Sequence, residues 1–369
     1  MAVVVQKYGL IGGAEKLVQE VTERIALNPR YDVHVLANQW TRQSDRITFH
    51  KIPIVPFPRF MKPISFARFV KREVSALKFD LVHSHERVFR ADIFSLHGVP
   101  HRMWVTQVRK KRMSLFDHAT ASIENSMIHN RACRAFLAVS TVTRDKYLQE
   151  FALDANKVQI IHPGVAMEKF TNDSPDIRHL VRRVYGIDES DTVVLFVGMN
   201  FEIKGLDLLM SAVSMAKAKN PSRRMKLLVV GKGNFRKYRA LSDRLGLKDD
   251  VIFAGVLKED IENVYIAADI FSLLSKFDAF GLTVLEAMAA SLPVIISTEV
   301  GAKDLIEEGV NGFTAAREDI PAIASKISFL LNRQARADVS RAAKETALRH
   351  PWEETANRIT QVYETLLAG

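Results

Sequence analysis

Two apolar patterns alternate along the chain. Short unbroken runs of valine, isoleucine and leucine are followed by longer stretches in which apolar residues recur at helical spacing. Unbroken runs are typical of strands buried on both faces of a parallel sheet, between layers of helices. We expect such strands at residues 2–5, 32–37, 81–83, 135–140, 158–161, 192–197, 226–230, 251–253, 270–274 and 293–297. The alternation predicts an α/β fold with doubly wound, Rossmann-like sheets.

The number of residues predicts two such domains. At roughly 150 residues per domain, a chain of 369 residues is too long for one packed unit. We place an N-terminal domain at residues 1–170 and a C-terminal domain at residues 171–350. A last helix over residues 351–369 is expected to pack back on the N-terminal domain.

Composition and charge limit the classes of protein that remain. Hydrophobic residues make up 47% and charged residues 25% of the chain, which excludes a disordered or collagen-like protein. The net charge of +10 comes from residues 1–170, which carry 26 basic and 15 acidic side chains. Cys133 is the only cysteine, so no internal disulfide forms. Because we also find no membrane-spanning run and no leader pattern, we expect a cytoplasmic protein.

A glycine turn joins the first expected strand to a helix. Gly12 and Gly13 precede an amphipathic stretch that starts at Ala14. Glycines in such a turn let the backbone approach a phosphate or sugar next to the free N–H groups of the helix. A plain tight turn is the alternative. The spacing differs from the dinucleotide fingerprint, and the second strand ends at Asn38 without a carboxylate, so a nicotinamide-dependent dehydrogenase is disfavoured.

The densest motif lies between residues 277 and 296, where a strand end, a glycine, a helix and a second strand follow one another. Gly281 begins the helix, so its first N–H groups face any bound diphosphate. Asp278 precedes this start and Glu286 follows it by two turns. Carboxylates on both sides of an anion site suit a nucleotide sugar, which has phosphates in the middle and hydroxyls at both ends. The alternative is that Asp278 caps the helix and Glu286 faces solvent.

This motif resembles the acidic motif of the retaining family-4 glycosyltransferases of GT-B fold. Asp278 stands where the family usually has a glutamate, and Ala279 replaces a common glycine. The resemblance implies a GT-B fold, with two doubly wound Rossmann-like domains facing across a cleft. It also implies that Asp278 binds sugar hydroxyls and that Glu286 binds the ribose diol.

Further motifs extend the resemblance over nearly the whole chain. The Gly12–Lys16 turn, the phrase at residues 161–165 and Lys204-Gly205 occur in family order. In the family a basic pair grips the diphosphate; here Lys204 is present, while Met199 and Ile203 occupy places where an arginine often stands. The donor-binding residues that the resemblance implies are Gly12, Gly13, Lys204, Asp278, Gly281, Leu282, Thr283 and Glu286.

The acceptor side rests on residues 80–104, which are similar to a segment of lipopolysaccharide core glucosyltransferases. Family-4 enzymes often have a histidine near the reacting sugar, and His97 is the best match, with His101 as its rival. A purely structural histidine is the alternative. The resemblance thus implies catalytic roles for His97, Lys204 and Asp278.

The reaction implied is the retaining transfer of a hexose, taken as glucose, from a nucleotide diphosphate sugar to a lipopolysaccharide core heptose or other glycolipid. No strict Asp-x-Asp motif and no His/Cys ligand cluster occurs, so we predict neither a metal nor a cofactor. The alternatives are a transferase for capsule or exopolysaccharide, and a non-catalytic basic protein that binds an anionic surface or nucleic acid.

The strongest concentration of positive charge lies in residues 59–112, with 13 basic and 4 acidic side chains. Arg109-Lys110-Lys111-Arg112 is flanked by Trp104, Phe116 and other apolar residues at roughly helical spacing. An amphipathic basic helix can lie on an anionic membrane, so we expect peripheral association with the inner face of the cytoplasmic membrane. A solvated surface helix is the alternative. Nucleic acid is disfavoured because no aromatic platform is interleaved with these cations.

Overall fold

The computed structural model describes all residues except 11, 42–43, 131, 171–174, 258 and 369. The chain divides into two compact units: Met1–Gly164 with Trp352–Gly369, and Val165–Pro351. The first unit therefore ends at Gly164, earlier than the predicted boundary between residues 170 and 171. Residue 171 lies outside the described part of the chain. The C-terminal helix α13 (Trp352–Ala368) belongs to the first unit, where it packs against α1 (Gly13–Ile25).

The first unit is built on a seven-stranded parallel sheet with the order β5-β3-β1-β6-β7-β8-β9. Its strands are β1 (Ala2–Val4), β3 (Val33–Ala37), β5 (Ile47–Lys51), β6 (Val82–Ser84), β7 (Ile93–Leu96), β8 (Ala135–Ala138) and β9 (Val158–Ile160). A separate pair joins β2 (Lys7–Tyr8) to β4 (Gln39–Trp40). The sequence pattern missed β5, because this edge strand is only partly buried and carries polar residues among its apolar ones. It also missed β7 and the two-residue strands β2 and β4.

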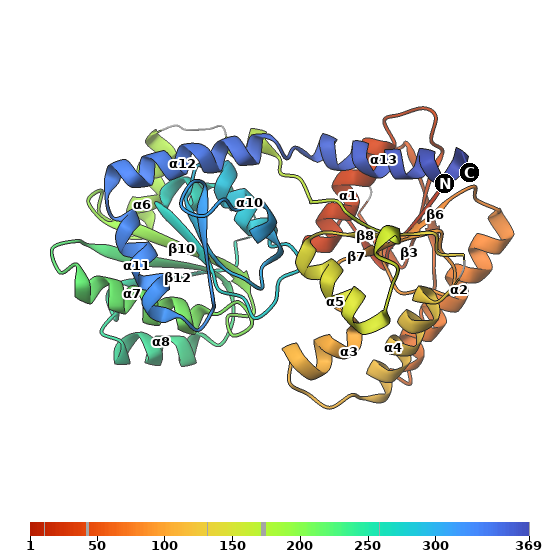
Figure 1. The fold of residues 1–369 in the computed structure, drawn as a ribbon, viewed down its shortest axis with the longest axis horizontal. Coiled ribbons are helices and arrows are strands. Elements are labelled where there is room, and N and C mark those ends of the chain that lie inside the picture. Colours follow the sequence, from red (N-terminus) through yellow and green to blue (C-terminus); the bar gives the residue numbers. More distant parts are fainter. Residues whose placement is uncertain (11, 42–43, 131, 171–174, 258, 369) are drawn as a thin grey trace. The chain divides into compact units, whose positions relative to one another are not determined.

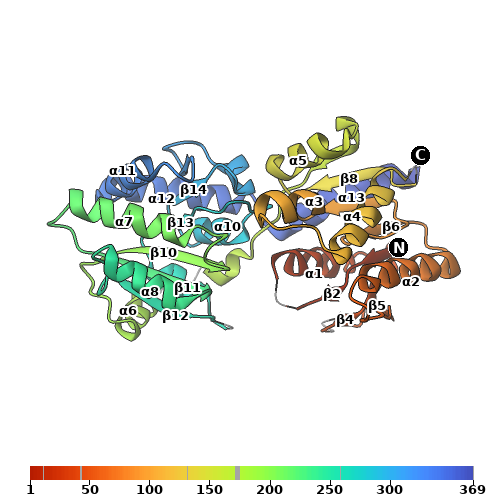
Figure 2. The ribbon, with the colours of Figure 1, turned by 90° about the horizontal axis from the view of Figure 1, so that it is seen from below.

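The second unit holds a six-stranded parallel sheet with the order β12-β11-β10-β13-β14-β15. Its strands are β10 (Thr192–Met199), β11 (Met225–Lys232), β12 (Val251–Gly255), β13 (Ile270–Leu273), β14 (Val294–Ser297) and β15 (Gly312–Ala315). Figure 2 shows β10, β11 and β12 side by side. In both sheets the strand order reverses beside the first strand, between β1 and β6 and between β10 and β13. Such a switch point is where doubly wound sheets bind ligands, beyond the carboxyl ends of the strands.

Helices cover both sheets (Figure 1). In the first unit they are α1, α2 (Met61–Leu77), α3 (His101–Met103), η1 (Trp104–Val108), α4 (Leu115–Ile128), α5 (Thr141–Phe151), η2 (Ala155–Lys157) and α13. In the second they are η3 (Met167–Phe170), α6 (Pro175–Val184), α7 (Leu206–Lys219), α8 (Phe235–Arg244), α9 (Glu262–Ala267), α10 (Leu282–Ala289), η4 (Gly301–Leu305), α11 (Ile320–Leu330) and α12 (Arg333–Leu348). Among the described residues, no helix combines the length and the apolar character that crossing a membrane requires.

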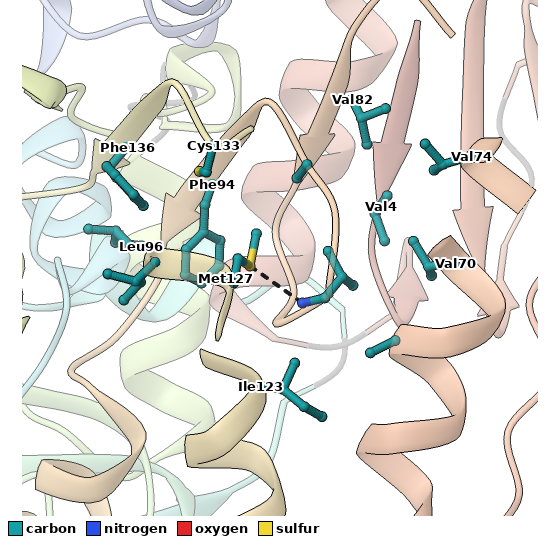
Figure 3. Close-up of a cluster of buried hydrophobic side chains, with 14 of the residues drawn as sticks. Val4, Val70, Val74, Val82, Phe94, Leu96, Ile123, Met127, Cys133 and Phe136 are labelled. Atoms are coloured by element: carbon teal, nitrogen blue, oxygen red, sulfur yellow. Dashed lines mark hydrogen bonds between the residues drawn. The ribbon is translucent and has the colours of Figure 1, made fainter. Parts of the chain in front are cut away.

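One hydrophobic core of the first unit packs α2 and α4 against its sheet. Figure 3 shows Val70 and Val74 of α2 and Ile123 and Met127 of α4 among side chains from the strands. The Met127 sulfur accepts a hydrogen bond from the Val88 N–H at 3.4 Å. This packing holds the loops after β6 and β7, which carry the candidate histidines.

The basic segment at residues 109–112 is not helical, so the prediction of an amphipathic basic helix there was wrong. Helical structure stops after η1 and resumes at α4. Lys110 has φ of 51°, the left-handed conformation that interrupts a right-handed helix. The next helix has its own start, because the Ser114 side chain accepts a hydrogen bond from the Asp117 N–H while Asp117 accepts one from the Ser114 N–H.

Candidate functional site

Two candidate donor-binding residues flank the switch point of the second sheet. Lys204 follows β10 and Asp278 follows β13, and these two strands lie side by side at the reversal of strand order. The loops are joined to one another, since the Lys276 N–H donates to the Ile203 carbonyl at 2.8 Å. The Lys204 Nζ pairs with the Asp278 carboxylate, and the two side chains are 23% and 17% exposed. The structure therefore brings together two residues that the sequence implicated separately.

Backbone contacts fix the position of both residues. Asp278 is held on two sides, because its N–H donates to the Glu299 carbonyl and its carbonyl accepts from the Gly301 N–H, both at 3.0 Å. Lys204 is followed by Gly205, which starts α7 at φ of 75°; a Cβ on Gly205 would lie 2.1 Å from the Leu274 carbonyl oxygen. Only glycine fits there. The ammonium and the carboxylate are thus presented from rigid elements.

The start of α10 lies next to this pair in the chain. Gly281 precedes it with φ of 87°, and a Cβ there would lie 2.9 Å from the Val300 Cγ1. The residue at the cap position is Gly281, which has no side chain to cap this helix start, and the Asp278 carboxylate pairs with Lys204. The N–H groups of half-buried Leu282 and Thr283 stand in the first turn. Uncapped N–H groups and the helix dipole together favour an anion at this end.

Glu286 is half-buried, so the alternative in which it faces solvent is wrong. Its Oε2 accepts a hydrogen bond from the Tyr265 hydroxyl at 3.0 Å. Tyr265 is fully buried, and burial together with Glu286 raises its pKa well above the usual value, so it remains a donor. Sequence reasoning missed Tyr265, because nothing in the spacing of 21 residues signals this contact.

At the glycine turn of the first unit, where a phosphate or sugar was expected, the structure places the side chain of Glu15. Helix α1 begins at Gly13 without a side-chain cap. A Cβ on Gly12 would lie 2.0 Å from the Glu15 Oε2, so this carboxylate sits over the helix start. A negative side chain in the first turn satisfies the helix dipole by itself. The predicted sugar- or phosphate-binding role of Gly12 and Gly13 therefore requires Glu15 to move or to bind sugar hydroxyls.

His97, the predicted catalytic histidine, is part of a histidine cluster at the ends of β6 and β7, in which His83 is buried and His85 and His97 are half-buried. Its Nε2 lies 2.8 Å from the His85 Nδ1. Beneath them, His83 contacts the Ser95 hydroxyl at 2.7 Å and the Tyr363 hydroxyl of α13 at 2.6 Å. Burial lowers the pKa of His83 to about 3, and burial with Arg87 lowers that of His97 to about 4. Both rings are therefore neutral at pH 7.

His101, the rival of His97, is tied to α4. Its Nε2 lies 3.0 Å from the Asp117 carboxylate, and its N–H donates to the buried Glu124 at 2.7 Å. The same Glu124 accepts from Arg87 at 2.7 Å and from the Tyr147 hydroxyl at 2.9 Å. The geometry gives His101 a structural role in this network and places His97 beside His85 at the carboxyl edge of the sheet. His85 was missed, although its place directly after a strand was a usable signal.

No three His, Cys, Asp or Glu side chains within the described ranges are grouped so that they could hold a metal ion. The expectation of a reaction without metal or cofactor stays a prediction.

Both halves of the chain match known families. Residues 11–169 match the model described as Glycosyltransferase Family 4, and residues 178–346 match the model described as Glycosyl transferases group 1. An uncharacterized glycosyltransferase of Methanocaldococcus jannaschii is 23% identical over an alignment that covers 96% of this chain and 92% of that protein.

Solved structures share the fold along the whole chain. WaaG, a glycosyltransferase involved in lipopolysaccharide biosynthesis, matches with a TM-score of 0.81 at 19% identity, covering 98% of each chain. The Anabaena protein HepE, in complex with UDP-glucose, matches with a TM-score of 0.75 at 19% identity, covering 99% of each chain.

Proposed function

Since the chain is a glycosyltransferase of GT-B fold, we propose that it transfers a hexose from a nucleotide diphosphate sugar and that the second unit binds this donor. One observation carries the proposal: an ammonium, a carboxylate and an uncapped helix start meet at the switch point of the second sheet. The binding of UDP-glucose by HepE supports UDP-glucose as the donor to test first.

The donor would bind along the motif from Asp278 to Glu286. The diphosphate lies against the N–H groups of Leu282 and Thr283 at the start of α10 and against the ammonium of Lys204. The Glu286 carboxylate accepts hydrogen bonds from the ribose diol, while Tyr265 holds its other oxygen. Asp278 accepts from hydroxyls of the hexose. Asp278 is paired with Lys204, so donor binding exchanges this ion pair for contacts of both groups with the donor.

In the proposed reaction the acceptor hydroxyl forms a bond to C1 of the hexose as the bond from C1 to the diphosphate oxygen breaks. Attack occurs on the face that the diphosphate leaves, so the configuration at C1 is retained. The leaving diphosphate takes the proton of the acceptor hydroxyl, and no protein nucleophile is needed. Negative charge grows on the leaving oxygen, where Lys204 and the start of α10 stabilise it; such stabilisation is usually the largest contribution to catalysis.

The acceptor is assigned to the first unit, with His97 as the residue nearest the reacting hydroxyl. A neutral His97, held by His85 at 2.8 Å, can hydrogen-bond a sugar hydroxyl without adding charge. The proposed acceptor is a lipopolysaccharide core heptose or a related glycolipid, which the likeness to WaaG in fold makes the first one to test.

Slow hydrolysis of the donor tests the enzymatic assignment without knowledge of the acceptor. The wild-type chain is expected to release UDP from UDP-glucose. His97→Ala should leave this release largely unchanged, because His97 acts on the acceptor and not on the donor. A panel of other sugar nucleotides covers the case of a different base or hexose. If the chain binds these donors but releases no diphosphate with any acceptor lipid, the proposal fails and a non-catalytic binding protein is the better description.

The first unit also carries the proposed membrane-binding surface. Arg109, Lys110, Lys111 and Arg112 are exposed in the non-helical segment before α4. Apolar side chains accompany them: Phe57 is 83% exposed and Leu115 is 72% exposed. Arg59 lies over the Phe116 ring at 5.1 Å. Cations near an anionic bilayer contribute about 1 kcal/mol each, and exposed apolar side chains can insert between headgroups.

Replacing all four residues from Arg109 to Arg112 by glutamine is expected to reduce co-sedimentation with vesicles of phosphatidylglycerol and phosphatidylcholine at least tenfold at low salt, since about four favourable charge contacts are lost. Donor hydrolysis should not change. Arg239→Gln with Arg244→Gln, exposed cations of the second unit, serves as a control. Equal binding by wild type and the quadruple variant would contradict a membrane role for this segment.

A further inference from the structure

The second unit has an arginine-rich cavity at the amino ends of its strands, whereas the proposed donor site lies at their carboxyl ends. The cavity has a volume of about 410 Å³. Its walls come from the amino ends of β10 and β11, from α6 and from the start of α12. It is lined by Arg178, Glu189, Ser190, Asp191, Thr192, Ser222, Arg223, Arg224, Asp269, Leu331, Arg333 and Arg336. The eight residues of β10 run from this cavity to the donor side of the sheet, a length of about 23 Å at roughly 3.3 Å per residue.

Some of these arginines have a structural task. Arg178 donates to the Asp269 Oδ1 at 2.9 Å, and the fully buried Arg182 behind it donates to the Asp269 Oδ2 at 2.8 Å. These contacts fix α6 to the start of β13. Arg224 pairs with Asp191 at 2.8 Å. Two of the three carboxylates of the cavity, Asp191 and Asp269, are therefore already engaged by arginines, and the third, Glu189, pairs with His179 at 2.7 Å.

Positive charge remains after these pairings. The lining has five arginines against three carboxylates. Arg336 lies 3.8 Å from Asp269, whose oxygens are already taken by closer arginines. Burial lowers the pKa of Arg336, and neighbouring arginines oppose the raising effect of Asp269. Within the described part of the chain, the guanidinium groups of Arg223 and Arg333 have no side-chain partner. This excess of positive charge favours the binding of an anion.

We propose that this cavity binds a small phosphorylated molecule at a site separate from the donor site. Guanidinium groups match phosphate oxygens in pairs, which makes arginine the preferred residue for such ligands. The volume of about 410 Å³ lies within the range of small-molecule sites. None of the described residues that line the cavity is aromatic, so a nucleotide base would have no ring on which to stack. The chemistry therefore favours a sugar phosphate or an inorganic polyphosphate over a nucleotide. The proposal does not depend on the transfer activity.

Calorimetric titration of the whole chain tests this site. Inorganic pyrophosphate and glucose 6-phosphate are the probes, and each titration is run with excess UDP so that the donor site is filled. The variant Arg223→Gln with Arg333→Gln is expected to raise the dissociation constant at least tenfold. Arg239→Gln with Arg244→Gln removes the same charge from exposed positions of α8 that do not line the cavity, and it should bind as the wild type does. Tighter binding of one probe identifies the phosphate class.

The proposal is overturned if the cavity variant binds both probes as tightly as the α8 control, or if the wild type binds neither at millimolar concentration. Thermal unfolding of each variant checks that it is folded. Should the double variant unfold, Arg223→Glu alone, at an exposed position, is expected to weaken binding of both probes at least tenfold. Donor hydrolysis is measured separately, so its absence would count against the proposed reaction and not against this site.

Discussion

Exchange of Glu286 for alanine is expected to lower donor hydrolysis by roughly 100-fold, because two charge-assisted hydrogen bonds to the ribose diol are lost at about 1.5 kcal/mol each. The loss should appear largely in the affinity for the sugar nucleotide, which reports on the ground state. Release of UDP from UDP-glucose, measured over a range of donor concentrations, gives both parameters.

Glu286→Ala also leaves the buried Tyr265 hydroxyl without the acceptor that it has at 3.0 Å, at a cost of about 1–3 kcal/mol in the free energy of unfolding. Glu286→Gln is the matched control, because its amide oxygen still accepts from Tyr265. We expect this variant to unfold at nearly the wild-type temperature. It should keep about a tenth of the activity, since the amide NH2 that then faces the ribose diol donates neutral hydrogen bonds in place of the charge-assisted ones that the carboxylate accepts. Wild-type rates for both variants would remove Glu286 from the site.

Exchange of Lys204 for alanine is expected to lower turnover more than tenfold, because the cation that stabilises the leaving diphosphate is worth about 1.5–3 kcal/mol in the transition state. The effect should fall on turnover more than on donor affinity. It is measured by the same UDP-release assay at saturating donor.

Two further variants distinguish a catalytic role of Lys204 from a structural one. Lys219→Ala removes a cation from the far end of α7 and should leave turnover unchanged. Asp278→Asn, which breaks the ion pair but keeps Lys204, tells whether the pair or the cation matters. If Lys204→Ala turns over at the wild-type rate while it is folded, the ammonium does not act on the leaving group.

The doubly wound architecture could be predicted from the sequence because buried parallel strands are unbroken apolar runs. Five strands among the described residues were not predicted. β5, with the sequence ITFHK, lies at the sheet edge, where one side need not be apolar. The others are short: β7 and β15 have four residues each, and β2 and β4 have two each. The helix that was wrongly predicted over residues 109–112 has a different cause. Apolar residues on both sides of residues 109–112 happen to continue at helical spacing, but the four cations repel one another and Lys110 takes up a left-handed conformation.

The candidate site was predicted as a set of residues and not as a set of contacts. Lys204 and Asp278 are 74 positions apart, and only the strand order that places β10 beside β13 brings them together. Contacts between side chains leave no trace in the spacing of residues. For this reason the sequence did not indicate Glu15 over Gly12 or Tyr265 on Glu286, whereas the place of His85 directly after a strand could have indicated it.

Hydrogen–deuterium exchange with and without UDP-glucose tests the central proposal most directly, because it reports which amides the donor protects. The account predicts slower exchange at residues 278–286 and 199–205, with protection lost in Glu286→Ala. Donor binding that protects neither segment, or that protects only segments elsewhere in the chain, would contradict it.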